Sequence, residues 1–230
     1  MKITYLSHSC FLIETSSHRL IIDPFLTSNP LAKVKAADIQ CDYVLVTHGH
    51  FDHMEDAVEI AKGNDATIIT SFELAQWLGG QGAKTHPLGL GGGFNFPFGR
   101  VKLTIAFHSA GVNPPPGWNG FVYVGTAAGM LIQADGKTLY HAGDTALTVE
   151  MQLLGQRNKI DLAMLPIGDN FTMGPEDAVA AAEFLKPGLT VPMHYNTFPP
   201  IKQDPAAFVA MLEVAGLKGK APGVGEVMEL

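Results

Sequence analysis

Three histidines and one aspartate crowd into one short segment, which reads THGHFDH from Thr47 to His53. Given the nine histidines in this chain, chance placement would produce such an HxHxDH pattern with an expectation on the order of 10⁻³. Neutral imidazole and carboxylate groups suit zinc and its first-row neighbours. The segment contains no cysteine, which argues against a structural site of the zinc-finger type. It therefore predicts a metal site of the catalytic kind.

This segment offers more ligands than one ion needs. His48, His50, Asp52 and His53 cannot all bind one tetrahedral ion that also keeps an open position, so two metals are expected. Gly49 lets the turn bend, so that side chains on either side can converge. Two metals require further ligands, and the candidates are polar residues that follow predicted strands: His108, Asp144 and His194.

Buried strands must position these ligands. Short apolar runs at Tyr43–Val46, Val101–Ala106 and Leu189–Val191 predict strands, and a histidine follows each of them. Asp144 follows Leu139-Tyr140 by way of a glycine. In layered α/β folds the carboxyl ends of strands form the edge at which sites are built. The predicted ligands should therefore meet at one such edge.

The remaining pattern predicts β-rich starts followed by αβ units. Predicted strands are Ile3–Leu6, Cys10–Thr15 and Arg19–Ile22 as a meander, then Phe121–Val124, Met130–Gln133, Lys137–Tyr140 and Leu162–Leu165, with Gly120–Ala134 interpreted as a hairpin. Predicted helices are Met54–Lys62, Ser71–Leu78, Ala146–Leu154, Pro175–Leu185 and Pro205–Ala215. Gly79–Phe98 is expected to be loop and edge structure. No linker interrupts the pattern, so we expect one α/β or α+β layered domain over residues 1–230.

Composition narrows the function classes. The net charge of −7 gives no electrostatic footprint for duplex nucleic acid, which makes nucleic acid a disfavoured partner. Cys10 and Cys41 are too few for a disulfide framework and are expected to be reduced core residues. No stretch predicts a membrane span, and the polar residues near the N-terminus break the apolar region that a signal peptide needs. A cytoplasmic location is the expectation.

Several motifs together resemble one known family. They are IDPF at Asp23, THGHFDH at His48, FHS at His108, YHAGDT at Asp144, IGDNFTMGPEDA from Ile167 and PMHYNTFP around His194. Across nearly its whole length the chain resembles metallo-β-lactamase superfamily hydrolases, most closely the small metal-dependent hydrolase branch near the ascorbate-6-phosphate lactonases. The resemblance implies the metallo-β-lactamase fold, an α+β αβ/βα four-layer sandwich with two central β-sheets flanked by helices.

The resemblance also implies a division of the ligands. His48, His50 and His108 would bind one metal, Asp52, His53 and His194 would bind the other, and Asp144 would bridge them. Asp23 matches an aspartate that typically orients a ligand imidazole by hydrogen bonding; a turn-forming Asp before Pro24 is an equal alternative from the sequence. Zn²⁺ is the expected metal, with Mn²⁺, Fe²⁺ or Ni²⁺ as alternatives.

Two adjacent divalent ions lower the pKa of a shared water from 15.7 to about 7, so hydroxide is the expected nucleophile. It would attack an ester, a lactone or a phosphodiester-type small molecule. Asp52 or Asp144 would carry a proton toward the leaving group. The resemblance suggests that His8 faces the site as a substrate or proton-transfer residue, although a structural role is an equal alternative.

Other polar residues have alternatives that the sequence leaves open. His141 is expected to be a strand-end or supporting residue. Asn170 either hydrogen-bonds substrate or forms a turn, and Lys202 either receives an anionic substrate or is a solvated surface residue. The Asn113–Gly120 loop, which carries Trp118, either walls the pocket or is a stiff surface loop.

Three rival functions share the fold. A di-iron oxidoreductase typically replaces the second histidine of the loop with Glu, whereas this chain has His50. A nuclease is disfavoured by the acidic balance and by the lack of an inserted basic arm. A non-catalytic metal-binding protein finds no support, because all seven ligand positions are filled. Lactonase-like relatives make a homo-oligomer compatible with the sequence.

Overall fold

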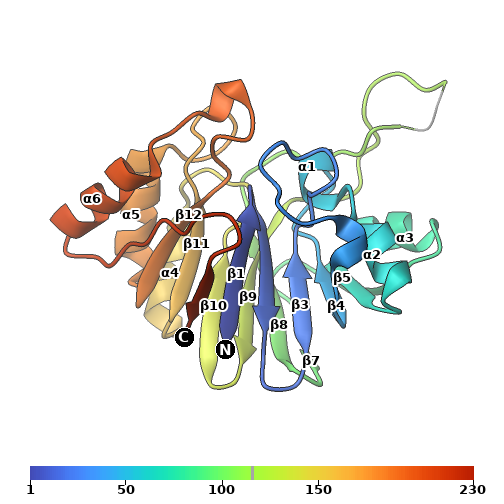
Figure 1. Cartoon of the computed structure of the whole chain (residues 1–230), viewed down its shortest axis with the longest axis horizontal. Helices are drawn as coiled ribbons and strands as arrows, with labels where there is room; N and C mark the ends of the chain where they lie inside the picture. The colour runs from blue at the N-terminus through green and yellow to red at the C-terminus, as the bar shows by residue number, and fades with distance from the viewer. Residues whose placement is uncertain (115–116) are drawn as a thin grey trace.

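Two mixed β-sheets form the centre of the structure, a computed structural model that describes residues 1–114 and 117–230 (Figure 1). The first sheet has the strand order β13-β1-β2-β3-β4-β5-β6 and the second β12-β11-β10-β9-β8-β7. The strands of the first sheet are β1 (Lys2–Ser7), β2 (Cys10–Glu14), β3 (Arg19–Ile22), β4 (Tyr43–Leu45), β5 (Thr67–Ser71), β6 (Lys84–Leu88) and β13 (Val227–Glu229). Those of the second are β7 (Gly93–Phe96), β8 (Gly99–Ile105), β9 (Ala128–Ala134), β10 (Lys137–His141), β11 (Leu162–Pro166) and β12 (Leu189–Met193).

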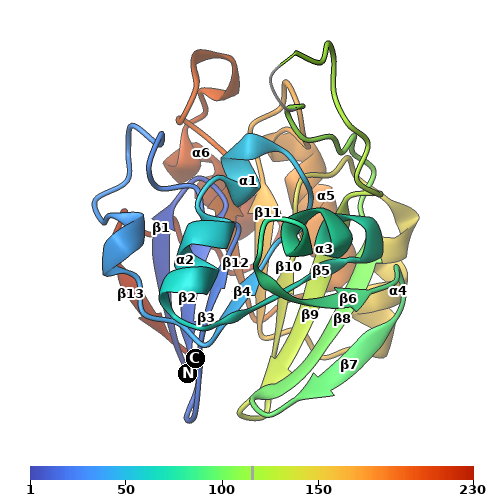
Figure 2. The same ribbon diagram turned by 90° about the vertical axis from the view of Figure 1, so that its right-hand side faces the viewer.

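Helices cover the outer face of each sheet. The helices are α1 (Phe51–Met54), α2 (Ala57–Gly63) and α3 (Phe72–Gly79) on one side, and α4 (Val149–Arg157), α5 (Pro175–Leu185) and α6 (Pro205–Val214) on the other. Figure 2, turned by 90°, shows the same two sheets between these groups of helices. This is the predicted αβ/βα four-layer sandwich. Among the described helices, none is both long and apolar enough to cross a bilayer.

The core follows from the two-residue period of the strands. In β3, Leu20 and Ile22 face the second sheet and join the larger hydrophobic cluster, whereas Ile21 joins the cluster under α2 and α3. Every residue of β11 is likewise buried, because this parallel strand is covered on both faces. Continuous apolar runs thus build inner strands of both sheets, such as β3 and β11.

Most predicted elements are confirmed. Residues of β1, β2 and β3 pair antiparallel as the predicted meander. The helices α5 and α6 begin with Pro175 and Pro205, and the Asp204 side chain caps α6 by accepting hydrogen bonds from two backbone N–H groups. The predicted helix Met54–Lys62 corresponds to α2, which begins three residues later, and Met54 is the last residue of α1. The Gly79–Phe98 segment, predicted to be loop and edge structure, contains β6 and β7, which are edge strands of their sheets.

The predicted strand Phe121–Val124 and the hairpin Gly120–Ala134 are wrong. Strand β8 pairs directly with β9, so the residues between them form a long connection, and its described part contains only one isolated bridge, between Val112 and Val122. Phe121 and Tyr123 are 74% and 69% exposed, so the alternating apolar residues have no sheet to bury against. The predicted loop Asn113–Gly120 belongs to this connection; its residues 115–116 lie outside the described residues.

Strand directions gather several chain segments at one edge. In the first sheet β1, β3 and β4 share a direction, since β2 is antiparallel to both of its neighbours and β3 is parallel to β4. In the second sheet β8, β10, β11 and β12 share a direction by the same reasoning. The loops after these strands supply the predicted ligands, so the predicted placement at carboxyl ends is confirmed.

Close packing of α4 on α5 generates a stability prediction. A Cβ added at Gly155 would lie 2.2 Å from the Phe184 carbonyl oxygen and 2.8 Å from the Leu185 Cα. Because these are backbone atoms, Gly155→Ala should lower the free energy of unfolding by about 1–3 kcal/mol in urea titrations. Gly63→Ala is the matched control, since a Cβ there meets nothing within 4 Å. Equal stability of the two variants would contradict this packing.

Candidate metal centre

The structure brings all seven predicted ligands and His8 together at the edge between the two sheets. His8 follows β1, and the segment from His48 to His53 leads from the end of β4 into α1. From the second sheet, His108, Asp144 and His194 follow β8, β10 and β12. The ligand atoms form two clusters that a third group, His48, His53 and Asp144, joins. The first cluster is His48, His50 and His108, and the second cluster is His8, Asp52, His53 and His194.

The first cluster consists of three converging imidazoles. His48 Nε2 lies 3.0 Å from His50 Nδ1, and His108 Nε2 lies 3.3 Å from the same nitrogen. His48 is buried, whereas His50 and His108 are half-buried and face the cavity described below. Burial lowers the pKa of all three histidines, which favours the neutral form that binds metals.

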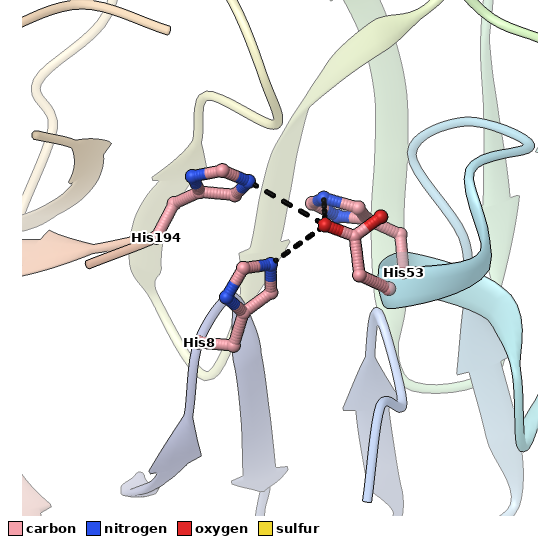
Figure 3. Close-up of side chains that lie close together, drawn as sticks. His8, His53 and His194 are labelled. Atoms are coloured by element: carbon pink, nitrogen blue, oxygen red, sulfur yellow. Dashed lines mark hydrogen bonds and ion pairs between the residues drawn. The ribbon is translucent and has the colours of Figure 1, made fainter. Parts of the chain in front are cut away.

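The second cluster surrounds the Asp52 carboxylate. Figure 3 shows His8, His53 and His194 approaching from three separate elements. Their Nε2 atoms lie 3.2, 3.9 and 3.8 Å, respectively, from Asp52 Oδ2. Burial disfavours the ionised carboxylate, but His53 and His194 outweigh that effect and hold the pKa of Asp52 far below its usual range. Asp52 is therefore an anion in the folded chain.

Asp144 joins the two clusters. Its Oδ2 lies 3.0 Å from His194 Nε2, 3.3 Å from His53 Nε2 and 3.5 Å from His108 Nε2. Burial would favour protonation of this carboxyl group, but His194 and His53 hold its pKa well below the usual value. Conversely, burial lowers and Asp144 raises the pKa of His194, with a net value of about 9. Without a metal, protons on the histidines compensate these buried carboxylates.

The hydrogen bonds of His53 test whether a cation fits. Its Nδ1 lies 2.8 Å from Asp23 Oδ2, and because an ionised carboxylate only accepts, Nδ1 carries the proton. A neutral His53 then presents the lone pair of Nε2 to Asp144, which also only accepts. His53 Nε2, Asp144 Oδ1 and both ring nitrogens of His194 are buried without a hydrogen-bond partner. A metal ion beside Asp144 would satisfy His53 Nε2 and His194 Nε2, so the residues fit a metal centre.

Asp23 has the hydrogen bonds that its predicted supporting position requires. Besides His53, it accepts hydrogen bonds from the Thr47 backbone N–H at 2.8 Å and from the Thr47 hydroxyl at 2.7 Å. Thr47 Oγ1 also lies 3.0 Å from His48 Nδ1. One fully buried carboxylate therefore fixes the start of the HxHxDH segment and the ring of its last histidine.

A cavity of about 590 Å³ opens over the clusters. Five of the predicted ligands line it: His50, Asp52, His108, Asp144 and His194. Its other described lining is largely aromatic or small, with Phe51, Phe121, Phe171 and Phe198 as the large side chains. The arrangement offers ligand atoms on the floor and apolar walls above them.

Most of the remaining sequence candidates lie outside this cavity. His8 is completely buried behind Asp52. His141 is also buried, hydrogen-bonds the Ser9 carbonyl and accepts from the Gly143 N–H, so it holds the turn before Asp144. Asn170, Lys202 and Trp118 are exposed and do not line the cavity, whereas Asn113, the first residue of the predicted Asn113–Gly120 loop, does.

Sequence reasoning missed Thr197 and the aromatic walls. Thr197 Oγ1 lies 2.9 Å from His8 Nδ1. The four phenylalanines come from helix α1 and three separate loops, so no spacing pattern connects them. For Thr197 and Phe198, the available signal was their place in the PMHYNTFP motif beside His194.

Comparisons with known proteins agree with this architecture. A family model described as a beta-lactamase superfamily domain matches residues 2–194, and the chain therefore belongs to that superfamily. Relatives named UPF0173 metal-dependent hydrolase occur in Anoxybacillus flavithermus and Bacillus subtilis, at 52% and 51% identity over 230 residues and 100% of both chains. Within the superfamily, the chain thus belongs to the UPF0173 metal-dependent hydrolase family.

A solved structure supports the same assignment. Igni18, a metallo hydrolase from Ignicoccus hospitalis, aligns with a TM-score of 0.89 and 36% identity, covering 100% of this chain and 98% of that chain. The resemblance and the fold class predicted from the motifs are confirmed.

The position of Asp23 generates a prediction about metal affinity. Asp23→Asn retains one acceptor oxygen but places an amide donor toward the donors of His53 and Thr47. We expect metal affinity to fall about 10–100-fold, measured by competition with a chromophoric chelator. Asp135→Asn, which changes an exposed carboxylate bonded to Ser16, should leave the affinity unchanged. Unchanged affinity in Asp23→Asn would show that this carboxylate does not support a ligand.

Proposed function

We propose that this chain is a metal-dependent hydrolase with a dinuclear site that cleaves an uncharged ester or lactone. The observation that carries the proposal is the pair of His/Asp clusters on either side of Asp144, with unsatisfied ligand atoms at His53, His194 and Asp144. His48, His50 and His108 would hold one ion, Asp52, His53 and His194 would hold the other, and Asp144 would contact both. Zn²⁺ is our first choice of metal, with Mn²⁺, Fe²⁺ or Ni²⁺ as alternatives.

Bound divalent ions would acidify a water molecule and polarise the bond under attack. The chain's own contribution is to orient the ligands and to move protons. Asp52 is the better-placed proton carrier, because its side chain is 14% exposed and lines the cavity, whereas Asp144 is 3% exposed. The apolar walls would limit the entry of competing water around the substrate.

The walls of the cavity support a carbonyl substrate over a phosphodiester. Among its described lining residues there is no Lys or Arg, and the large side chains are phenylalanines. Phosphoryl substrates are usually held by such cations, in addition to metals. Lys202, the cation suggested by the sequence for an anionic substrate, is exposed outside the cavity. We therefore favour a neutral substrate with an apolar body.

The rival functions gain less support. His50 lies within the first cluster and would serve as a nitrogen ligand, where a di-iron oxidoreductase would typically carry a carboxylate. A nuclease would need basic side chains near the cavity, and the described lining has none. A non-catalytic role would not explain why a cavity opens over a complete set of seven candidate ligands.

Metal removal tests the proposed function. Chain stripped with chelator should lose hydrolysis of p-nitrophenyl esters and aryl lactones, and Zn²⁺ or Mn²⁺ should restore it with nearly two ions per chain by elemental analysis. The kcat/KM for these neutral substrates should exceed that for bis-p-nitrophenyl phosphate. If reconstituted chain holds metal but hydrolyses neither class, the proposal fails. A preference for the phosphodiester would refute only the substrate class.

An aromatic wall residue tests substrate contact separately. Phe171 is 54% exposed at the cavity, so Phe171→Ala should raise KM for an apolar aryl ester about 3–10-fold through lost apolar contact, with little change in kcat. Phe94→Ala removes a similarly exposed phenylalanine from β7, outside the cavity, and should leave KM unchanged. Equal KM values in the two variants would exclude Phe171 from the substrate site.

A further inference from the structure

The proposed function assigns no role to His8, although this residue is buried beside the proposed ligands. It is completely buried, so it cannot contact a substrate in the cavity. Its ring packs edge-on against Phe25 and Phe198, with centroids 5.5 and 5.7 Å away. On its remaining side the ring faces the other residues of the second cluster. A fully buried imidazole aimed at other ligand atoms needs an explanation.

The Nε2 atom of His8 belongs geometrically to the second cluster. One ligand atom from each of His8, Asp52, His53 and His194 lies within 4.8 Å of the other three. Its ring centroid is 4.2 Å from that of His194 and 5.4 Å from that of His53. In Figure 3 the three rings converge from different elements, with His8 approaching from the end of β1. One ion between them would therefore be within reach of all four.

The hydrogen bonds on the far side of the ring favour a free lone pair on Nε2. His8 Nδ1 lies 2.9 Å from Thr197 Oγ1, and the Thr197 hydroxyl donates to the Tyr195 carbonyl at 3.4 Å. Since a hydroxyl has one hydrogen, Nδ1–H donates to Thr197 in this arrangement. Nε2 then faces Asp52 Oδ2 at 3.2 Å, and both are acceptors. His53 shows the same pattern, with Asp23 in place of Thr197.

The backbone fixes this orientation. Ser7 and His8 have φ values of 102° and 56°, so two successive non-glycine residues adopt the left-handed region. The His8 carbonyl accepts hydrogen bonds from the His194 backbone N–H at 2.9 Å and from the Tyr5 hydroxyl at 3.3 Å. Such unfavourable conformations persist where surrounding contacts enforce them, often at functional sites. Here those contacts tie His8 to another member of the second cluster.

We propose that His8 Nε2 is a fourth protein ligand in the second cluster, beside Asp52, His53 and His194. The inference rests on the proposed dinuclear site and extends it. With Asp144 shared, the second cluster would offer five protein ligands and the first cluster four. The first ion would thus keep more room for substrate, and the second site would suit ions that accept five or six ligands.

Direct coordination is tested by loading metal-free chain with ¹¹³Cd²⁺ and labelling its histidines with ¹⁵N. We expect scalar coupling between one bound cadmium and Nε2 of His8, because this coupling requires a bond. The His8 signal is assigned by its loss in His8→Phe, or in His8→Asn should the first variant not fold. Two bound cadmium ions without coupling to His8 would overturn the inference and leave the proposed function intact. No bound cadmium would overturn both.

Metal affinity provides a second readout. His8→Phe should lower the affinity for one of the two ions more than about 100-fold and leave the affinity for the other within about threefold. Thr197→Val should lower the affinity for the same ion about 10–100-fold, because Thr197 orients the His8 ring without binding metal itself. His86→Phe is the matched control, because His86 lies on β6 and packs against Phe94 and Phe96. Unchanged affinity of both ions in folded His8→Phe would also overturn the inference.

Discussion

The site depends on positive charge that compensates its carboxylate and imidazole acceptor atoms. Asp144 lies 3.0–3.5 Å from imidazole nitrogens of three histidines, and the buried Asp23 and the partly buried Asp52 add further negative charge. Burying carboxylates without compensation is costly, so positive charge must accompany folding. In the metal-free chain this charge comes from protons, because Asp144 and its neighbours raise the pKa of His53 and His194 despite burial. A metal ion would replace these protons, which makes metal binding and proton release linked events.

The two-sheet architecture is what brings these charges together. The first sheet contributes His8, Asp23 and the HxHxDH segment, and the second contributes His108, Asp144 and His194. Neither sheet alone supplies a complete cluster, since each cluster contains residues from both sheets. The backbone hydrogen bond from His194 to His8 joins the sheets directly beside the ligands. A change in the packing of one sheet on the other would therefore alter both clusters at once.

Local signals explain how much the sequence could predict. The HxHxDH spacing and the apolar runs before His48, His108 and His194 are local patterns, and the structure bears out their strands and their placement at one edge. The strand predicted at Phe121–Val124 failed because alternating aromatic residues also suit an exposed connection beside a cavity, and only tertiary context separates the two cases. The orientation of His8 depends on left-handed backbone at Ser7 and on Thr197, 189 positions away in the chain, so spacing alone could not reveal it.

Both clusters reach the cavity through two of their residues, and each also has a buried part. His50 and His108 of the first cluster and Asp52 and His194 of the second line the cavity, whereas His48, His8 and His53 are buried. A substrate in the cavity could therefore approach either cluster, while the buried imidazoles hold each cluster from the protein side. The fold thus divides each cluster into ligands that face the cavity and ligands enclosed by protein, a division that the ligand spacing alone does not show.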